Sequence, residues 1–382
     1  MKKFFQTKKY SEQELVISAS ASVLAIVFGL LFGFVFMLIV SPGEALRGFG
    51  YILVGGFNDG LLSIGSMITF ATPLLFTGLA VAFAYRTGLF NIGASGQLMI
   101  GAFAAVAVGV PQWWTYPDGV RTLVDNPFLQ LGAFHWVVAV LAAFIAGGLW
   151  GFIPGALKAW FNVNEVVASI MLNYVAMFLN SLLINRYLLN TLTAKAFNVV
   201  ESATIPKMGL DRILTDGIRS TQANGSFFLA ILAIIIIHII LNKTVFGYEL
   251  KAVGFNREAA RYAGMNSRRN IILSMSISGA LAGLGGASLF LLTGRNLDPV
   301  QVILTQGFDG IAIALLGLGS PIGVGLAGLF FSSLKVGGQY LQILSFRIEI
   351  IDIIISVIIY LAALSLVLRA IITTFFKRME EK

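Results

Sequence analysis

The chain has 382 residues, of which 57% are hydrophobic and only 12% are charged, and its mean hydropathy is +0.87. A water-soluble domain has about a quarter charged residues and could not bury this much apolar surface, so the composition excludes a soluble fold. The net charge of +8 is expected to lie in cytoplasmic loops, because no basic groove with interleaved aromatic residues indicates nucleic acid binding.

Residues that carry chemistry are scarce. There is no cysteine, and the two histidines, His135 and His238, are far apart in the sequence. Disulfides, thiolate chemistry and a zinc site, which needs three or four ligands, are therefore not expected. The chain also lacks the G-x-x-x-x-G-K-[ST] motif for ATP. We predict a non-catalytic protein with no metal or cofactor of its own.

The N-terminal segment 1–14 is basic and precedes an apolar run over 15–40. This arrangement resembles a secretory signal peptide, but the run is too long for the apolar core of one and lacks a small-residue cleavage site. We therefore predict that 15–40 is a retained first membrane helix and that 1–14 is cytoplasmic. The segment 44–60 is expected to form a short external helix.

Further stretches with few charges follow along the chain, and a spanning helix needs roughly 20 apolar residues. They predict an all-α integral membrane protein, a polytopic bundle of about ten transmembrane helices that forms the single domain 1–382. The predicted spans are 15–40, 61–85, 88–110, 133–157, 164–189, 226–242, 270–293, 301–319, 321–340 and 349–369.

Basic residues indicate the orientation, because Lys and Arg favour cytoplasmic loops. With ten spans, the N-terminal segment, the turns at Arg86 and Lys158, the loop 243–269 and the tail 370–382 all fall on one side. The loop 190–225 falls on the external side; it is long and carries acidic as well as basic residues. Both termini are therefore predicted to face the cytoplasm.

Glycine is abundant, with 41 residues, and several glycines recur four positions apart within predicted spans. In lipid, such pairs let helix backbones approach closely. Packing inside the bundle, a dimer face and a moving gate are all compatible with the pairs Gly29/Gly33, Gly151/Gly155 and Gly279/Gly283.

Polar side chains inside predicted spans are candidates for a translocation path, because polar groups in hydrocarbon are costly. The stretch RTGLFNIGASGQ, residues 86–97, carries Asn91, Ser95 and Gln97 among glycines that loosen a helix. It is suited to line a path through a protein-lined cavity. The alternative is an ordinary helix start with Asn91 as its N-cap.

The stretch NVNEVVASIMLNY, residues 162–174, opens the fifth predicted span. Asn164 is a suitable N-cap, and Glu165 suits the positive end of the helix dipole, which is the alternative to a role of Glu165 in the path. Asn173 lies deeper in the span, where no helix end explains it, and we assign it to the path as well.

The stretch GFDGIAIALLGLGSPIG, residues 307–323, contains Asp309, the one carboxylate well inside a predicted span. A proton or cation relay at Asp309 would make the protein an ion-coupled secondary transporter; N-capping at a broken helix is the alternative. No chain of carboxylates runs through the spans, as many ion-coupled carriers would require. A pore-forming subunit that takes its energy from a partner is therefore the main hypothesis.

The loop 243–269 contains GFNREAARYAGMN, residues 254–266. Asn256 is a suitable N-cap, Glu258 falls in the first turn, and Gly264 is a suitable terminator. We predict a two-turn helix, capped at both ends, that inserts into a groove on a soluble partner; a solvated helix on anionic headgroups is the alternative. The residues assigned to this docking element are Asn256, Arg257, Glu258, Ala259, Ala260, Arg261 and Gly264.

The sequence AVGFNREAARYAGMNSRRN resembles the coupling loop of permease subunits in bacterial ABC importers, where a Glu-Ala-Ala…Gly core docks on the ATPase. Here the core is Glu258, Ala259, Ala260 and Gly264, but the Ile-x-Leu-Pro of the wider motif is replaced by Ile-Ile-Leu-Ser at a shorter offset. With AYRTGLFNIGASGQLMIGAF, NVNEVVASIMLNYVA and GFDGIAIALLGLGSPIG, the chain resembles the branched-chain amino acid/ribose-type permeases, above all their simple-sugar/nucleoside branch.

This resemblance implies a permease subunit that moves nucleosides, or simple sugars, across the bacterial cytoplasmic membrane. ATP and Mg would be bound by a separate ATP-binding cassette ATPase. The other implied partners are a second homologous permease, in a heterodimer, and a substrate-binding lipoprotein. The competing hypotheses are an ion-coupled secondary transporter with Asp309 as the proton or ion site, and a structural or assembly protein of the membrane.

Overall fold

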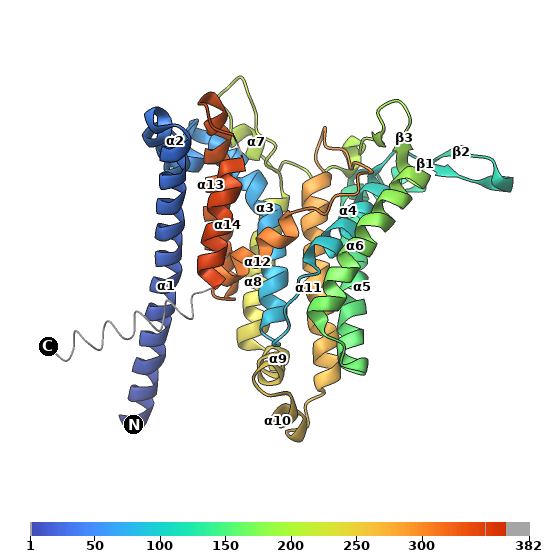
Figure 1. The fold of residues 1–382 in the computed structure, drawn as a ribbon. Helices are drawn as coiled ribbons and strands as arrows, with labels where there is room; N and C mark the ends of the chain where they lie inside the picture. Colours follow the sequence, from blue (N-terminus) through green and yellow to red (C-terminus); the bar gives the residue numbers. More distant parts are fainter. Residues whose placement is uncertain (1, 348, 364–382) are drawn as a thin grey trace.

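The computed structural model describes residues 2–347 and 349–363, and most of the described chain is helical (Figure 1). The helices are α1 (Lys2–Val40), α2 (Pro42–Val54), α3 (Gly60–Tyr85), α4 (Ala94–Gly109), α5 (His135–Phe161), α6 (Glu165–Leu183), α7 (Leu210–Ile213), α8 (Ser226–Lys243), α9 (Val245–Phe255), α10 (Arg257–Tyr262), α11 (Ser267–Phe290), α12 (Gln306–Leu316), α13 (Pro321–Gln339) and α14 (Glu349–Ala363). The short strands are β1 (Gln112–Thr115), β2 (Thr122–Asp125), β3 (Leu189–Asn190) and β4 (Lys195–Ala196).

The apolar helices confirm the predicted class of protein. Within the described residues, seven are long and apolar enough to cross a membrane: Ser22–Val40, Gly60–Tyr85, Pro127–Phe161, Glu165–Leu188, Ser226–Lys243, Ser267–Phe290 and Pro321–Ile343. Ala94–Gly109 and Gln306–Leu316 are shorter apolar helices, and the described part of α14 has 15 residues. The chain is a multi-pass membrane protein, but two of the predicted spans, 88–110 and 301–319, correspond to helices shorter than expected.

In both of these shorter spans, the helix begins further along the chain than predicted. The span expected at 88–110 begins as a helix only at Ala94, and the span expected at 301–319 begins only at Gln306. Gly88 has a φ of +71°, a left-handed conformation that a helix does not continue through. Pro299 lies in the irregular segment before α12, where its missing N–H disfavours helix.

The helices pack in two groups (Figure 1). In one group, α4, α5 and α11 contact one another and α6 packs on α4 and α5; in the other, α1 packs on α2 and α14, and α13 packs on α2, α12 and α14. Helix α3 lies between them and contacts α8, α11, α12 and α13. Because of this central position, every residue from Ala71 to Ala84 is buried.

The predicted glycine pairs lie at helix contacts within this chain. A Cβ placed on Gly151 of α5 would lie 3.0 Å from the Cα of Gly279 of α11, and one placed on Gly279 would lie 2.9 Å from the Cα of Gly151. Gly29 and Gly33 of α1 similarly receive the side chains of isoleucines of α14. The close approach of backbones that glycine permits is therefore used for packing inside the bundle at these pairs.

The two ends of the bundle carry different structures. The start of α1 lies at the same end as α9 and α10, whereas α2, α7 and the antiparallel β1–β2 hairpin lie at the opposite end (Figure 1). The predicted external helix within 44–60 is α2, and the predicted loop 190–225 contains the β3–β4 pair and α7. The tail 370–382 lies outside the described residues.

Candidate functional site

Helix α10 begins as the sequence predicts. Asn256 has an extended backbone, and its side-chain Oδ1 accepts a hydrogen bond from the N–H of Ala259 at 3.0 Å. This bond satisfies one of the free N–H groups at the start of the helix. Glu258 lies in the first turn. The predicted N-cap and the predicted position of the acid are both confirmed.

The end of α10 is also fixed by local hydrogen bonds. Gly264 has a φ of +83°, which an L side chain rarely adopts. The N–H of Gly264 donates to the C=O of Arg261, and the N–H of Met265 donates to the C=O of Ala260, both at 3.0 Å. These two bonds form a Schellman motif. Because a helix this short is otherwise prone to fray, the two caps keep it formed.

Two aromatic rings that the sequence analysis did not single out are exposed at the two ends of α10. Phe255 is 91% exposed and Tyr262 is 92% exposed, and they flank the ends of the helix. Among the residues predicted to dock, Ala260 is instead buried, in a cluster with Val253 and Met275. The signal that could have singled them out was an aromatic residue at each end of an otherwise polar helix. Apolar side chains left in water in this way are typical of binding surfaces.

The loop 243–269 contains a second helix, α9, which the sequence analysis did not predict. Thr244 caps it by accepting from the N–H of Gly247 at 3.1 Å, and Gly247, Leu250 and Val253 form its buried face. Helices α9 and α10 project together from one end of the bundle (Figure 1). Helix α10 is therefore mounted on a second helix rather than on a flexible linker.

The end of α9 touches the turn that follows α3. A Cβ placed on Gly254 would lie 2.5 Å from the carbonyl oxygen of Arg86, 3.0 Å from the N of Gly88 and 3.0 Å from the C of Thr87. The contact is thus made between two stretches of backbone. Glycine is needed on both sides, because Gly254 has no room for a side chain and Gly88 has a positive φ.

The turn 86–88 is also tied to two other parts of the bundle. The hydroxyl of Thr87 donates to the hydroxyl of Ser274 of α11 at 2.8 Å. The Nε of Arg86 donates to the carbonyl oxygen of Gly319, in the turn between α12 and α13, at 3.0 Å. The turn therefore joins α3, α9, α11 and the α12–α13 connection at the end of the bundle that carries α10.

The chain runs from this turn into a buried group of amide side chains. Asn91 Nδ2 donates to Gln97 Oε1 at 2.8 Å and to Ser278 Oγ at 2.7 Å, and Asn91 Oδ1 accepts from the N–H of Gly93 at 3.0 Å. Gly93, not Asn91, is the N-cap residue of α4. The alternative interpretation of Asn91 as the N-cap was therefore wrong, and its side chain braces the irregular segment before the helix.

Asn173 of α6 braces the same segment from outside. Its Oδ1 accepts from the N–H of Gly96 at 2.8 Å and its Nδ2 donates to the carbonyl oxygen of Ile92 at 3.0 Å. Ser95 is fully buried, and its Oγ has no hydrogen-bond partner in the described part of the chain. Asn91, Ser95, Gln97 and Asn173 are thus brought together around the start of α4, and each is at most 1% exposed.

Glu165 lies at the start of α6. Asn164 caps the helix by accepting from the N–H groups of Val166 at 2.9 Å and Val167 at 3.3 Å, which confirms the predicted cap. The carboxylate of Glu165 forms an ion pair with Lys158 at 2.9 Å, across the turn between α5 and α6. The charge near the helix N-terminus and the ion pair together account for an acid at this position.

Asp309 lies in the first turn of α12, but the N-cap residue is Thr305, so the predicted N-capping role was wrong. The Oδ2 of Asp309 is 2.6 Å from the Nζ of Lys335 of α13. The two side chains are 13% and 18% exposed, respectively. This ion pair joins α12 to α13.

Metal-binding groups are not found in the part of the chain described here: no cluster of at least three His, Asp or Glu side chains is suited to hold an ion. The arrangement as a whole offers a capped helix with exposed aromatic rings at one end, joined through backbone contacts to a braced break inside the bundle. Such an arrangement can bind a partner and pass on its movement.

Comparison with known protein families gives a match over most of the chain. The family profile described as the permease component of the branched-chain amino acid transport system matches residues 63–364. No solved structure matches the chain at a significant level.

Several characterised permeases are similar in sequence. A guanosine ABC transporter permease of Bacillus subtilis is 40% identical over 357 residues, 93% of this chain and 96% of the relative. A nucleoside ABC transporter permease of Lactococcus lactis is 33% identical and covers 92% of both chains. A glucose ABC transporter permease of Haloferax volcanii is 34% identical over 72% of this chain and 68% of the relative. A second such permease from each of the two bacteria matches at 28% identity.

Proposed function

Because the chain belongs to the family of permease components of the branched-chain amino acid transport system, we propose that it is the transmembrane subunit of a bacterial ABC importer for nucleosides. The observation that carries the substrate class is the 40% identity to a guanosine permease over 93% of the chain. The glucose permease covers 72% of the chain, so simple sugars are the second candidate. The chain itself is a non-catalytic membrane subunit.

The proposed orientation places α10 in the cytoplasm, together with both termini, and places α2, α7 and the β1–β2 hairpin outside. Ten spans would give this arrangement, with α4 and α12 crossing as shorter helices and α14 as the last span. Support comes from the start of α1, which lies at the same end of the bundle as α10 (Figure 1), and from the basic residues of the segments at that end.

In the proposed mechanism, an ATP-binding cassette ATPase holds α10 through Phe255 and Tyr262. Burying a large apolar side chain contributes about 1.5–3 kcal/mol, so these two rings are the proposed anchors, with Arg257, Glu258, Ala259 and Arg261 around them. Movement of α10 passes through Gly254 to the turn 86–88. The contact of two backbones suits this role, because it has no flexible side chain to absorb the movement.

The proposed translocation path runs beside the break before α4. Ser95 is the candidate for contact with substrate, since its buried hydroxyl lacks a partner among the described residues. Asn91, Gln97 and Asn173 support the backbone of the path. Glu165 and Asp309 lie in ion pairs and hold helices at its margins.

The chain is proposed to work with three partners in the cytoplasmic membrane of a bacterium. They are an ATPase that binds ATP and Mg, a substrate-binding lipoprotein, and a second permease in a heterodimer. The second permease is supported by Bacillus subtilis and Lactococcus lactis. Each has a second guanosine or nucleoside ABC transporter permease that is similar to this chain.

The alternative of an ion-coupled secondary transporter rests on Asp309. The ion pair with Lys335 counts against it, because it gives Asp309 a structural role in joining α12 to α13. Reconstitution in vesicles separates the two functions. An importer takes up guanosine only with the ATPase, the receptor and ATP, whereas uptake by the purified chain in an ion gradient alone would overturn the proposal.

The docking surface can be tested by co-purification. We expect Phe255→Ala together with Tyr262→Ala, and separately Arg257→Glu together with Arg261→Glu, to remove the ATPase from the purified assembly. Phe57→Ala is the matched control, because Phe57 is 63% exposed but belongs to the proposed outer end. Unchanged ATPase yield in both double variants would show that α10 is not the docking element.

A further inference from the structure

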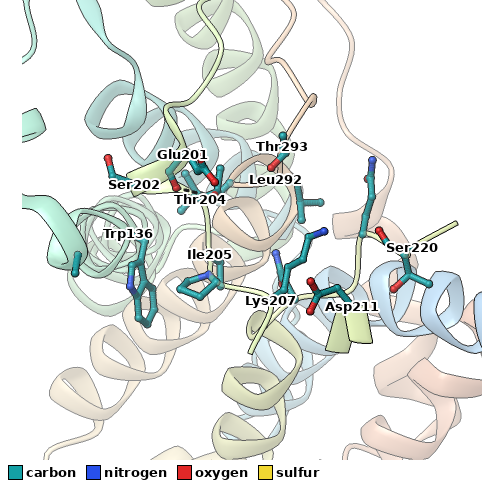
Figure 2. A pocket seen from close by; sticks show the side chains of 16 residues that line it. Trp136, Glu201, Ser202, Thr204, Ile205, Lys207, Asp211, Ser220, Leu292 and Thr293 are labelled. Atoms are coloured by element: carbon teal, nitrogen blue, oxygen red, sulfur yellow. Dashed lines mark hydrogen bonds between the residues drawn. The ribbon is translucent and has the colours of Figure 1, made fainter. Parts of the chain in front are cut away.

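An open pocket lies at the end of the bundle opposite α10. It is lined by the start of α5, the segment 201–224 and the residues that follow α11, and Figure 2 shows the side chains that line it. Its volume is about 830 Å³, within the range of about 300–1,000 Å³ that small-molecule sites occupy. The lining residues used below are Trp136, Glu201, Lys207, Asp211, Thr221 and Asn224.

Two lining side chains are buried and carry polar atoms that are not satisfied. Thr221 is 7% exposed and Asn224 is 5% exposed, and neither Thr221 Oγ1 nor Asn224 Nδ2 has a hydrogen-bond partner among the described residues. Thr221 packs against Gly65 of α3, and Asn224 Oδ1 accepts from the N–H of Ser226 at 3.1 Å. These contacts hold both side chains in place while an oxygen and an amide nitrogen stay without partners. Such groups call for an explanation, and a ligand that completes their hydrogen bonds is one.

The charged lining groups are likewise unused by the fold. Glu201, Lys207 and Asp211 take part in none of the ion pairs found among the described residues. In Figure 2, Lys207 and Asp211 lie near each other on one side of the pocket, and Glu201 lies with Ser202 and Thr204 on another. Two acids and one lysine give these three groups a net charge of −1, which disfavours an anionic ligand.

We propose that this pocket is a nucleoside-binding subsite on the outer face of the permease, an inference that rests on the function proposed above. Carboxylates of Glu201 and Asp211 accept hydrogen bonds from ribose hydroxyls. The indole of Trp136 offers a face on which a base stacks. Thr221 Oγ1 and Asn224 Nδ2 gain partners from the sugar or from the polar edge of the base. The net negative charge excludes phosphorylated nucleotides in favour of the neutral nucleoside.

Thr221→Val tests the subsite through two quantities, the melting temperature of the assembly and its affinity for guanosine, which should not fall together. The variant removes the hydroxyl with little change of shape, so the ligand-free assembly should melt at the same temperature or higher, because a buried group without a partner is lost. Affinity for guanosine should nevertheless fall by roughly three- to tenfold, the value of one neutral hydrogen bond. A residue that only supports the fold would not show this combination.

Thr72→Val is the matched control. Thr72 is also buried, but its hydroxyl already donates to the carbonyl oxygen of Ile68 at 2.8 Å, and it does not line the pocket. This variant should melt at a lower temperature and keep the guanosine affinity of the unchanged protein.

Guanosine affinity is measured by equilibrium binding of radiolabelled guanosine to the permease assembly purified with its ATPase and without the receptor, and tryptophan fluorescence is followed as a second readout. Trp136→Phe should abolish the fluorescence change, and guanosine monophosphate should not compete. Unchanged guanosine affinity in Thr221→Val and Trp136→Phe overturns the subsite. Loss of receptor binding with unchanged guanosine affinity also overturns it and makes the pocket a receptor contact.

Transport by the full importer separates failure of the subsite from failure of the proposed function. If the full transporter imports guanosine while the assembly binds none, the subsite fails and the proposed function stands. If the full transporter imports no nucleoside, the proposed function fails.

Discussion

Replacing Gly254 by alanine is expected to weaken the link between ATP hydrolysis and transport. The new Cβ would lie 2.5 Å from the carbonyl oxygen of Arg86 and 3.0 Å from the N of Gly88. Non-bonded atoms prefer separations of about 3.5–4.0 Å, so the end of α9 and the turn 86–88 must move apart by about 1 Å. Both partners are backbone, and no side-chain rotation relieves the clash.

The size of the effect follows from this clash. Overpacking of this kind costs about 1–3 kcal/mol. If the contact is closed in one transport state and loosened in the other, that cost changes the balance between the states by roughly 5- to 150-fold. Helix α10 keeps its own caps, so docking of the ATPase should survive while the transmission of its movement does not.

The assay compares guanosine uptake and ATP hydrolysis in the same reconstituted vesicles. For Gly254→Ala, ATPase co-purification should be unchanged and the amount of guanosine imported per ATP should fall. Gly50→Ala is the control, because a Cβ on Gly50 of α2 has no described atom within 4 Å. Import per ATP at the unmodified level in Gly254→Ala would refute the view that this contact carries the coupling.

Three further changes have expected outcomes. Asn256→Ala should cost the helix α10 about 0.5–2 kcal/mol of cap stability and reduce ATPase yield, whereas Asn256→Asp keeps an acceptor oxygen and should preserve the yield. Asn173→Ala leaves the N–H of Gly96 unpaired and should cost about 1–3 kcal/mol, seen as a lower melting temperature. Asp309→Asn should be more destabilising than the double replacement Asp309→Asn with Lys335→Met, because the single change leaves a partly buried ammonium unpaired. ATP-driven uptake retained by the double variant would rule out Asp309 as a proton site.

Local signals in the sequence were sufficient to predict helix α10. Asn256 and Gly264 act on backbone groups only a few residues away, so the caps of α10 could be predicted from residue type and spacing alone. Helix α9 was not predicted, because its buried face depends on contact with α8 and α11 and its sequence is short and mixed in polarity.

Contacts between distant segments were beyond what the sequence could indicate. The contact of Gly88 with Gly254 joins residues that no spacing rule relates, and the partner of Asp309 is 26 residues away. The role of the polar residues of the spans in a path stays a prediction. The interpretation of Asn91 and Asp309 as caps failed because each has a tertiary partner. Phe255 and Tyr262 were proposed as anchors only because their side chains are exposed, and exposure depends on how the rest of the loop folds.

The contact of Gly151 with Gly279 has a mechanical consequence for this transporter. At Gly151 and Gly279, helices α5 and α11 meet backbone to backbone. No side chain lies between them there that could change rotamer, so the contact should keep its geometry through the transport cycle. It can therefore serve as a fixed reference against which other helices are measured. Since the chain has no cysteine, two cysteines introduced for labels, one at the exposed Leu149 of α5 and one on α9, would report the displacement of α9 and α10 without background labelling of this chain.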